Sequence, residues 1–355
     1  MKGIVLAASK AKCLLKAPGL RNYVPVTKTA PLPTFRGEKT AILCPGQGAQ
    51  YVGMLQNLSP DIEEPLREMT SEILGYDLVK ICRNGPKEIL DRTLYTQPAV
   101  MVASILGYYK LKNKLREEHD VEDFNAGFVF GNSVGEVSAL CIANWITFEE
   151  ALQVIKVRAE SMDRAVNMAE SAMVGVHGLD FDDVKQMCED LTENAGDKNK
   201  HISIAVERFY KSVALGGSKD LVEKVLNREH FLLKNPSKVK ISKMFMSAAF
   251  HTPYMNPAIE EFYDALCSVN ITPNDTTLVS NVTAQKYTNK EEVAELMARQ
   301  IAEPVLWNTI LDKVRGKYLS GSVENIYEVG AGRQLKRMYE KLDRDLFSNV
   351  QTVDM

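Results

Sequence analysis

The sequence has few residues of the kinds that build metal sites and disulfide frameworks. Its six cysteines are scattered with no C-x-x-C pair, and only five histidines occur among 355 residues. Neither a zinc site nor a disulfide network is therefore expected. We expect no metal, and thiols that are reduced and mostly packed as small apolar side chains.

Long apolar runs and a surplus of positive charge are also missing. No apolar run approaches the roughly 18 residues of a membrane-spanning helix, so we expect no membrane insertion. The formal net charge is -3, which gives no reason to expect a nucleic-acid partner. Apolar residues make up 45% of the chain, a fraction typical of a globular protein with a proper core.

Acidic residues are absent from the beginning of the chain. No Asp or Glu precedes Glu38, whereas basic residues recur from Lys2 to Arg36. Such a leader is typical of a mitochondrial transit peptide, although it contains a single serine. We interpret 1–37 as a transit peptide or a disordered basic leader and expect the protein in the mitochondrial matrix. In that compartment the glycosylation sequon at Asn281 has no expected role.

Strands and helices alternate in most of the remaining chain, which predicts a mainly parallel sheet covered on both faces. Strands are predicted at 41–44, 126–130, 277–280 and 325–329, and helices at 60–74, 98–115, 134–143, 147–164, 253–269, 291–301, 305–314 and up to 342. Thr147 and Glu150 form a capping-box pattern at the start of one helix.

The segment 172–244 has a different order of elements. Strands are predicted at 172–177, 201–209, 212–215 and 238–244, with helices at 181–191 and 218–229. The order is that of the split βαβ, or ferredoxin-like, fold. We therefore predict an α/β protein whose large domain, 40–168 and 245–355, is interrupted by a small domain at 169–244.

Ser133 is the strongest candidate for a catalytic residue. It lies in Gly131-Asn132-Ser133-Val134-Gly135, a G-x-S-x-G motif between a predicted strand and a predicted helix. That context is the one a nucleophile elbow requires, because a tight turn needs small residues around the serine. The helix N-terminus also directs partial positive charge at the serine oxygen. The alternative is a structural turn serine.

A serine nucleophile needs a base, and His251 is the best-placed histidine. It lies in a loop where the chain returns from the small domain to the large one, and loops beyond a sheet edge are common positions for catalytic groups. A histidine that caps a helix remains the alternative. His119 lies in a charged run, whereas His177, His201 and His230 belong to the small domain.

Arg158 is unusual because it lies at the edge of the apolar stripe of its helix. From the pattern alone, a pair with a buried carboxylate is favoured over a ligand, although a guanidinium fork also suits a substrate acid.

The loop 45–50, Pro-Gly-Gln-Gly-Ala-Gln, lacks the Lys of a phosphate-binding P-loop. Its glycines allow the backbone to approach a reacting group, or simply form a turn.

Taken together, these segments resemble the malonyl-CoA:acyl-carrier-protein transacylase family from about residue 40 to the C-terminus. The matching motifs are P-G-Q-G-x-Q at 45–50, T-Q-P-A at 96–99, G-x-S-x-G-E at 131–136, Arg158, Phe-His at 250–251, R-Q ending at Gln300, and E-V-G-x-G at 328–332. Several independent motifs at compatible spacing make the resemblance specific.

The resemblance implies an α/β-hydrolase-like large domain with a ferredoxin-like insertion. It implies that Ser133 is acylated and that His251 is the base, oriented by the backbone carbonyl of Gln300. The backbone N–H groups of Gln47 and Val134 would form the oxyanion hole. On the substrate side, Arg158 would hold the malonyl carboxylate, and Gln300 would be a second substrate-binding residue.

The resemblance also implies the reaction. A malonyl group would pass from malonyl-CoA to Ser133 and then to the phosphopantetheine thiol of an acyl carrier protein, feeding mitochondrial fatty-acid synthesis. Coenzyme A thioester would be a substrate, with no tightly bound cofactor, and we expect a monomer. The alternatives are a serine esterase or lipase and a non-catalytic subunit that binds the carrier protein.

Three departures from the family pattern stand out. Asn132 replaces the histidine that often precedes the nucleophile, and Ala331 replaces a proline in the closing motif. The stretch 205–208 replaces an Asn-containing stretch on a strand of the small domain, so the resemblance assigns no role to any residue there.

Overall fold

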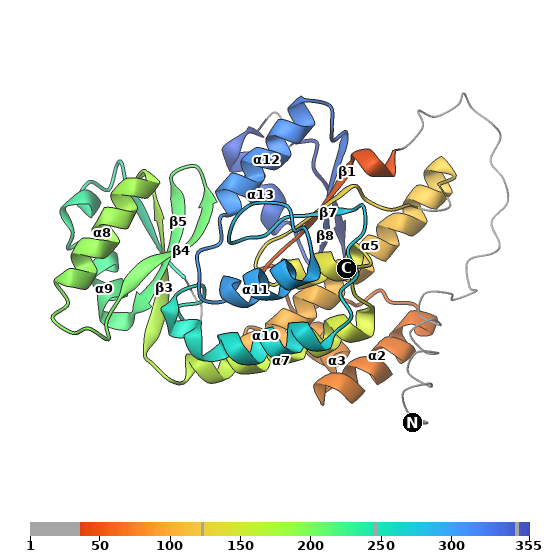
Figure 1. Ribbon diagram of the computed structural model, residues 1–355, viewed down its shortest axis with the longest axis horizontal. Coiled ribbons are helices and arrows are strands. Elements are labelled where there is room, and N and C mark those ends of the chain that lie inside the picture. The colour runs from red at the N-terminus through yellow and green to blue at the C-terminus, as the bar shows by residue number, and fades with distance from the viewer. Residues whose placement is uncertain (1–35, 122–123, 245–247, 345–347) are drawn as a thin grey trace.

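The computed structural model describes residues 36–121, 124–244, 248–344 and 348–355. The predicted leader lies outside this part of the chain except for its last two residues. Two sheets organise the molecule, one in a larger body and one in a smaller body at its end (Figure 1).

The larger body contains a five-stranded sheet in the order β7-β2-β1-β8-β9, and every pairing in it is parallel. The strands are β1 (Thr40–Cys44), β2 (Phe128–Gly131), β7 (Thr277–Leu278), β8 (Asn325–Gly330) and β9 (Gln351–Asp354). The predicted strand at 277–280 is shorter than expected, and β9 was not predicted.

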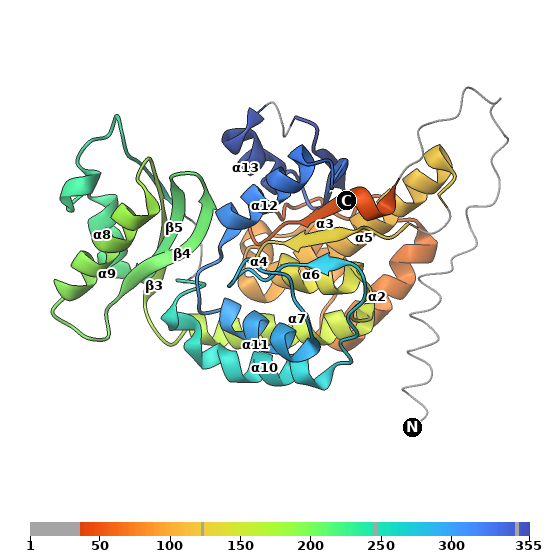
Figure 2. The same ribbon diagram turned by 45° about the horizontal axis from the view of Figure 1, so that its top comes forward.

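Helices cover both faces of this sheet, as the sequence predicted. In the turned view, α12 and α13 lie on one side of the sheet, with α6, α7 and α10 on the other (Figure 2). The helices of the larger body are α2 (Pro60–Leu74), α3 (Leu78–Asn84), α4 (Lys87–Leu90), α5 (Thr93–His119), α6 (Gly135–Ile142), α7 (Phe148–Val166), α10 (Ile259–Ser268), α11 (Lys290–Gln300), α12 (Trp307–Leu319) and α13 (Gln334–Leu342).

The alternation of side chains along β1 explains why both faces are covered. Ile42 and Cys44 pack into one apolar cluster, and Ala41 and Leu43 pack into a second cluster on the opposite face. Successive side chains of a strand point to opposite faces, so a strand that is apolar throughout requires a helical layer on each side.

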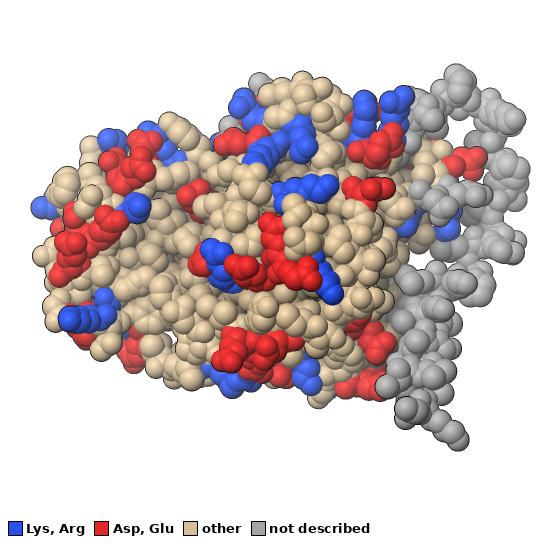
Figure 3. All heavy atoms as spheres, viewed as in Figure 1, with Lys and Arg blue, Asp and Glu red and all other residues tan. Residues whose placement is uncertain are grey.

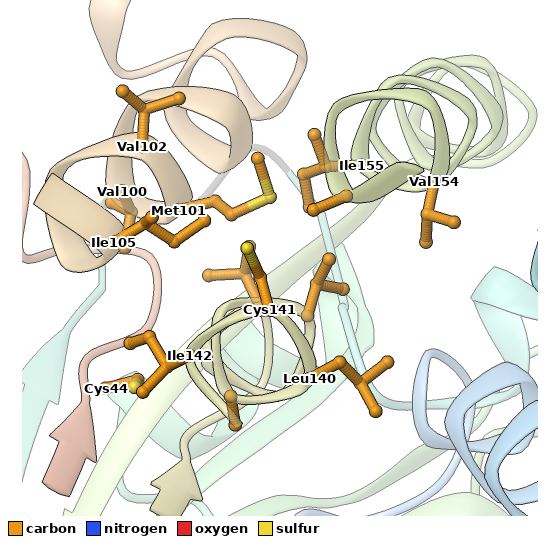
Figure 4. Close-up of a cluster of buried hydrophobic side chains, with 14 of the residues drawn as sticks. Cys44, Val100, Met101, Val102, Ile105, Leu140, Cys141, Ile142, Val154 and Ile155 are labelled. Atoms are coloured by element: carbon orange, nitrogen blue, oxygen red, sulfur yellow. The ribbon is translucent and has the colours of Figure 1, made fainter. Parts of the chain in front are cut away.

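The first of these clusters contains buried side chains of α5, α6 and α7 that point toward one another (Figure 4). Cys44 and Cys141 belong to it as free, buried thiols, and Cys82 and Cys188 are also free and buried. These four cysteines are packed as the sequence predicted, whereas Cys267 is free and exposed. Burial raises the pKa of the Cys141 thiol to about 12, which keeps it protonated and inert.

Helix α5 begins earlier than predicted. Proline is common at the first position of a helix, so Pro98 suggested a start there. In the structure Pro98 lies inside α5, which begins at Thr93. Proline cannot donate to the carbonyl four residues earlier, and the hydroxyl of Tyr76 donates to that carbonyl, Leu94 O, at 3.1 Å.

The predicted helix at 253–269 begins instead as a 3-10 turn, Pro253–Ala258, that contains a second proline.

The smaller body is a four-stranded antiparallel sheet in the order β4-β5-β3-β6. Its elements are β3 (Ser171–His177), α8 (Phe181–Glu193), β4 (Ile202–Phe209), β5 (Ser212–Ser218), α9 (Lys219–Leu226) and β6 (Lys240–Lys243). This sequence of elements confirms the predicted ferredoxin-like arrangement. An apolar cluster separate from those of the larger body fills it.

Backbone hydrogen bonds connect the two bodies. Val206 of β4 forms a parallel bridge with Val305, which lies just before α12. Glu207 N donates to Val305 O at 2.9 Å, and Val305 N donates to Ala205 O at 2.9 Å. Therefore β4 belongs to the small sheet and also contacts the larger body directly.

The surface carries charges of both signs. Acidic and basic side chains are interspersed on the face shown in Figure 3. Within the described parts of the chain, no helix combines the length and the apolar character needed to cross a membrane.

Candidate active site

Ser133 lies on a sharp turn between β2 and α6, as predicted. Its φ is +53°, in the left-handed region that costs free energy for any residue other than glycine. Glycine is required on both sides. A Cβ atom on Gly131 would lie 2.1 Å from the carbonyl oxygen of Gly135, and one on Gly135 would lie 2.3 Å from that of Cys44. The G-x-S-x-G spacing follows from these close contacts.

The structure brings Ser133 and His251 into direct contact. Ser133 Oγ lies 2.8 Å from His251 Nε2, and His251 Nδ1 lies 2.6 Å from the backbone carbonyl oxygen of Gln300. A carbonyl can only accept, so Nδ1 carries the proton and Nε2 is free to accept from the serine. A backbone carbonyl therefore orients the base, as the family resemblance implied.

His251 is only 5% exposed and is kept neutral by its surroundings. Its pKa is lowered to about 4, mainly by burial and to a smaller extent by the positive charge of Arg158, whereas the hydrogen bond to Gln300 O acts in the opposite direction. The imidazole is thus unprotonated, as a general base must be, at any pH well above 4.

Arg158 lies in the same pocket, fully buried on α7. Its guanidinium donates to Gln97 Oε1, to Gln300 Oε1 at 2.7 Å and to Ser133 Oγ at 3.4 Å. Burial lowers its pKa to about 10, so it stays charged at neutral pH. No carboxylate of the described residues forms an ion pair with it, so the interpretation favoured from the pattern alone, a buried ion pair, is wrong.

The predicted oxyanion donors belong to Gln47 and Val134, which line the same pocket as Ser133. The neighbouring N–H groups are occupied, because Gly46 N donates to Gln334 Oε1, Gly48 N to Gln50 Oε1 and Ser133 N to Asn281 Oδ1. In the described structure no partner accepts from the N–H of Gln47 or Val134, which leaves both available to a ligand.

Gln300 lies behind the catalytic pair and does not line the pocket in the described structure. Its side-chain oxygen accepts from Arg158, and its side-chain nitrogen donates to Glu136 Oε2 at 2.5 Å and to Ser133 O at 2.9 Å. We therefore assign it a supporting role for Arg158 and His251 rather than direct contact with substrate.

Glu136 is a buried carboxylate that sequence reasoning left without a role. It accepts from Gln300 Nε2, from the Tyr287 hydroxyl at 2.8 Å and from Asn281 N at 3.0 Å. Burial raises its pKa to about 7, although these hydrogen bonds and Arg158 lower it. The family motif contained this residue, but nothing in the sequence showed which side chains surround it.

The pocket lies between the two bodies, with a polar end at Ser133 and apolar walls. It is lined by Gln47, Asn132, Ser133, Val134, Arg158, Met162, Met173, Val206, Arg208, Ala214, Met244, Phe250, His251, Gln334 and Met338. Four methionines among them provide adaptable apolar contacts. None of the other histidines lines this pocket, and His177 and His230 bond instead to Ser212 and Asp190.

Arg208 is the second cation of the pocket, and the sequence gave it no role. It is half-buried on β4, and burial lowers its pKa. Among the described residues it has no hydrogen-bond or ion-pair partner. Two cations and a serine–histidine pair in one pocket favour an anionic substrate for acyl transfer.

The family model of the acyl transferase domain matches residues 42–324. The mitochondrial malonyl-CoA-acyl carrier protein transacylase of Mus musculus is 32% identical over 324 residues, which cover 89% of this chain and 82% of that protein. This chain belongs to the malonyl-CoA-acyl carrier protein transacylase family. The mitochondrial transacylase of Homo sapiens is 31% identical and covers 98% of this chain and 88% of its own length.

Solved structures of transacylases agree with this membership. The acyl-carrier-protein-S-malonyltransferase from Bartonella henselae superposes with a TM-score of 0.75 at 26% identity, covering 88% of this chain and 95% of that chain. A malonyl-transacylase in complex with its type II PKS acyl-carrier protein gives a TM-score of 0.74 at 25% identity, covering 89% and 96%. The family therefore accounts for both sheets, since the matches span most of each chain.

Proposed function

We propose that this chain transfers a malonyl group from malonyl-CoA to the phosphopantetheine thiol of acyl carrier protein. The observation that carries the proposal is the position of Arg158. Its buried guanidinium has no ion pair in the described structure and lies 3.4 Å from Ser133 Oγ, which is hydrogen-bonded to the neutral His251. In a malonyl ester of Ser133 the free carboxylate is two bonds from the acyl carbon. A guanidinium this close to Ser133 Oγ is therefore within reach of that carboxylate.

The first half of the reaction acylates Ser133. Its Oγ attacks the thioester carbon while His251 Nε2 takes the hydroxyl proton. The N–H groups of Gln47 and Val134 stabilise the resulting oxyanion, and each such donor is typically worth about 10²–10³ in rate. The C–S bond then breaks, and coenzyme A leaves as the thiol with the proton from His251.

The second half repeats these steps in reverse with another thiol. The phosphopantetheine thiol gives its proton to His251 and attacks the malonyl-serine ester, and Ser133 leaves with that proton. Arg158 holds the malonyl carboxylate throughout. In this scheme coenzyme A thioester is a substrate, and the protein's own residues supply the acid, the base and the oxyanion donors.

The proposal extends to location and organisation. The mouse and human relatives are named mitochondrial, and we place this protein in the mitochondrial matrix, where it would supply malonyl groups for fatty-acid synthesis. The small body corresponds to an insertion at 169–244 within an acyltransferase domain formed by 40–168 and 245–355. We propose that the protein acts as a monomer.

The decisive experiment follows the acyl-enzyme. Intact mass measured after brief mixing with malonyl-CoA should show a malonyl adduct on the wild type, which carrier protein then removes. Ser133→Ala should show no adduct. Ser138→Ala, which changes a buried serine on α6, the helix that follows Ser133, should behave as the wild type. An adduct on Ser133→Ala at the wild-type level, or hydrolysis without transfer to the carrier, would contradict the proposal.

A further inference from the structure

Asn281 connects the loop after β7 to the turn that carries Ser133. It is fully buried. Its side-chain oxygen accepts from Ser133 N at 2.7 Å, and its side-chain nitrogen donates to Gly131 O at 2.7 Å. One amide group therefore bridges the residue before the turn and the nucleophile itself.

The bridging fixes the orientation of the amide. A backbone N–H can only donate and a carbonyl can only accept, so the oxygen of Asn281 must face Ser133 and its nitrogen must face Gly131. The backbone of Asn281 is held as well, because its N–H donates to Glu136 Oε1 at 3.0 Å and its carbonyl accepts from Leu306 N at 2.9 Å.

The bridge supports a backbone conformation that Ser133 does not favour by itself. A left-handed φ at a serine persists only where surrounding contacts hold it. The hydrogen bond from Ser133 N also removes that group from the set of free donors at the turn. The next N–H along the chain, that of Val134, has no acceptor in the described structure, and Val134 lines the same pocket as Ser133.

We propose that Asn281 is a positioning residue for the nucleophile. Its amide holds the turn so that Ser133 Oγ meets His251 Nε2 while the N–H of Val134 faces the oxyanion. This inference rests on the proposed function only in taking Ser133 as the nucleophile.

Glu136 extends the positioning to the other catalytic groups. The carboxylate that accepts from Asn281 N also accepts from Gln300 Nε2, and Gln300 contacts both Arg158 and His251. The nucleophile, the base and the guanidinium are therefore held by one buried hydrogen-bond network. Loss of the Asn281 amide should disturb the nucleophile, while Arg158 keeps its own contacts to Gln97 and Gln300.

The test measures two quantities in single-turnover acylation by malonyl-CoA: the maximal rate, which reports on chemistry, and the concentration at half-maximal rate, which reports on binding. Asn281→Ala should lower the maximal acylation rate about 10²-fold, the typical cost of a displacement of about 1 Å at a reacting group. The malonyl-CoA concentration at half-maximal rate should change less than about threefold, because Arg158 is untouched. A rate close to the wild type, or a loss confined to that concentration, would overturn the proposal.

Asn274→Ala is the matched control. Asn274 lies just before β7, as Asn281 lies just after it. Its amide also bridges two segments, accepting from Trp145 Nε1 at 3.1 Å and donating to Ala143 O at 2.7 Å. It contacts the far end of α6 instead of the turn. At a temperature where melting curves show every variant folded, Asn274→Ala should acylate at the wild-type rate. An equal loss in both variants would show that Asn281 has a structural role only.

Two further measurements keep the outcome decisive. Labelling of Ser133 by a fluorophosphonate needs a positioned serine but no particular acyl donor, so it should slow in Asn281→Ala even if malonyl-CoA is not the substrate. If the variant does not fold, the wild-type amide proton of Ser133 is measured by hydrogen exchange. Slow exchange at this position, which lies outside the helices and strands, is expected, and rapid exchange would overturn the proposal.

Discussion

Arg158 and His251 influence each other through charge, although they are not hydrogen-bonded to each other. The guanidinium adds to the effect of burial in lowering the pKa of His251, which keeps the base neutral. The same positive charge is the feature that suits an acyl group with a free carboxylate. We therefore propose that a single residue affects both the base and the selectivity for the acyl group.

Arg158→Ala should separate malonyl from acetyl transfer. A hydrogen bond to a charged group is worth about 1.5–3 kcal/mol, so kcat/KM for malonyl-CoA should fall about 10–100-fold, whereas acetyl-CoA has no carboxylate to lose. Steady-state rates with the two donors measure this ratio. Arg164→Ala, at an exposed position on the same helix, is the control and should leave the ratio unchanged. Equal losses for both donors would contradict the carboxylate assignment.

The same variant should also change the pH dependence of acylation. Removal of a neighbouring positive charge favours protonation, so the pKa of His251 should rise from about 4. The base works only when neutral, and the acid side of the pH–rate profile should therefore move to higher pH. Acylation by acetyl-CoA as a function of pH tests this, because acetyl-CoA has no carboxylate for Arg158 to bind. A shift toward lower pH would contradict the assignment.

At the scale of elements, β8 and α13 are joined by a buried carboxylate. Glu328 is 1% exposed, and its two oxygens accept from Leu335 N and Lys336 N, both at 2.8 Å. Helix α13 has no side-chain cap from its own first residues, so a residue of the preceding strand satisfies its unpaired N–H groups. Burial nevertheless raises the pKa of Glu328 to about 7.

This raised pKa gives Glu328→Gln a pH-dependent effect on stability. Between the unfolded value of 4.5 and about 7, the folded wild type holds a proton that the unfolded chain has released, so this group's contribution to stability falls as pH rises. The glutamine lacks that dependence. The free energy of unfolding of the variant minus that of the wild type should therefore rise across this range. Urea denaturation at several pH values measures it, and a difference that falls with pH would refute the assigned shift.

At the scale of the whole molecule, the sequence predicted the class, both sheets and the positions of most elements. The continuous apolar run of β1 and the capping box of α7 are local signals, and the structure contains both. The start of α5 was missed because the partner of Leu94 O is a tyrosine 18 residues earlier. Strand β9 depends on pairing with β8 and packing against α5, and the helices α3 and α4 are too short to give a periodic pattern.

The catalytic site was predictable to the extent that its residues lie in local motifs. Ser133 is in a recognisable turn, and the contact of Ser133 with His251, 118 residues later, followed from the family resemblance. Asn281, Glu136 and Arg208 were not assigned because their roles depend on which side chains surround them. An amide in a glycosylation sequon does not reveal from sequence that it faces a turn 148 residues away.

The bridge between Val206 and Val305 has a consequence for how this protein can diverge. Peptide groups rather than side chains make the two hydrogen bonds of this bridge between the small sheet and the larger body, so their formation does not depend on which residues occupy those positions. Side chains also join the bodies elsewhere, as the Tyr254 hydroxyl does by donating to Asn199 O, but the bridge makes the spacing tolerant of substitution on one side of the pocket. The pocket's methionine-rich walls can change size or polarity over evolution, and the preference for one acyl group over another can drift while the spacing at the nucleophile is preserved.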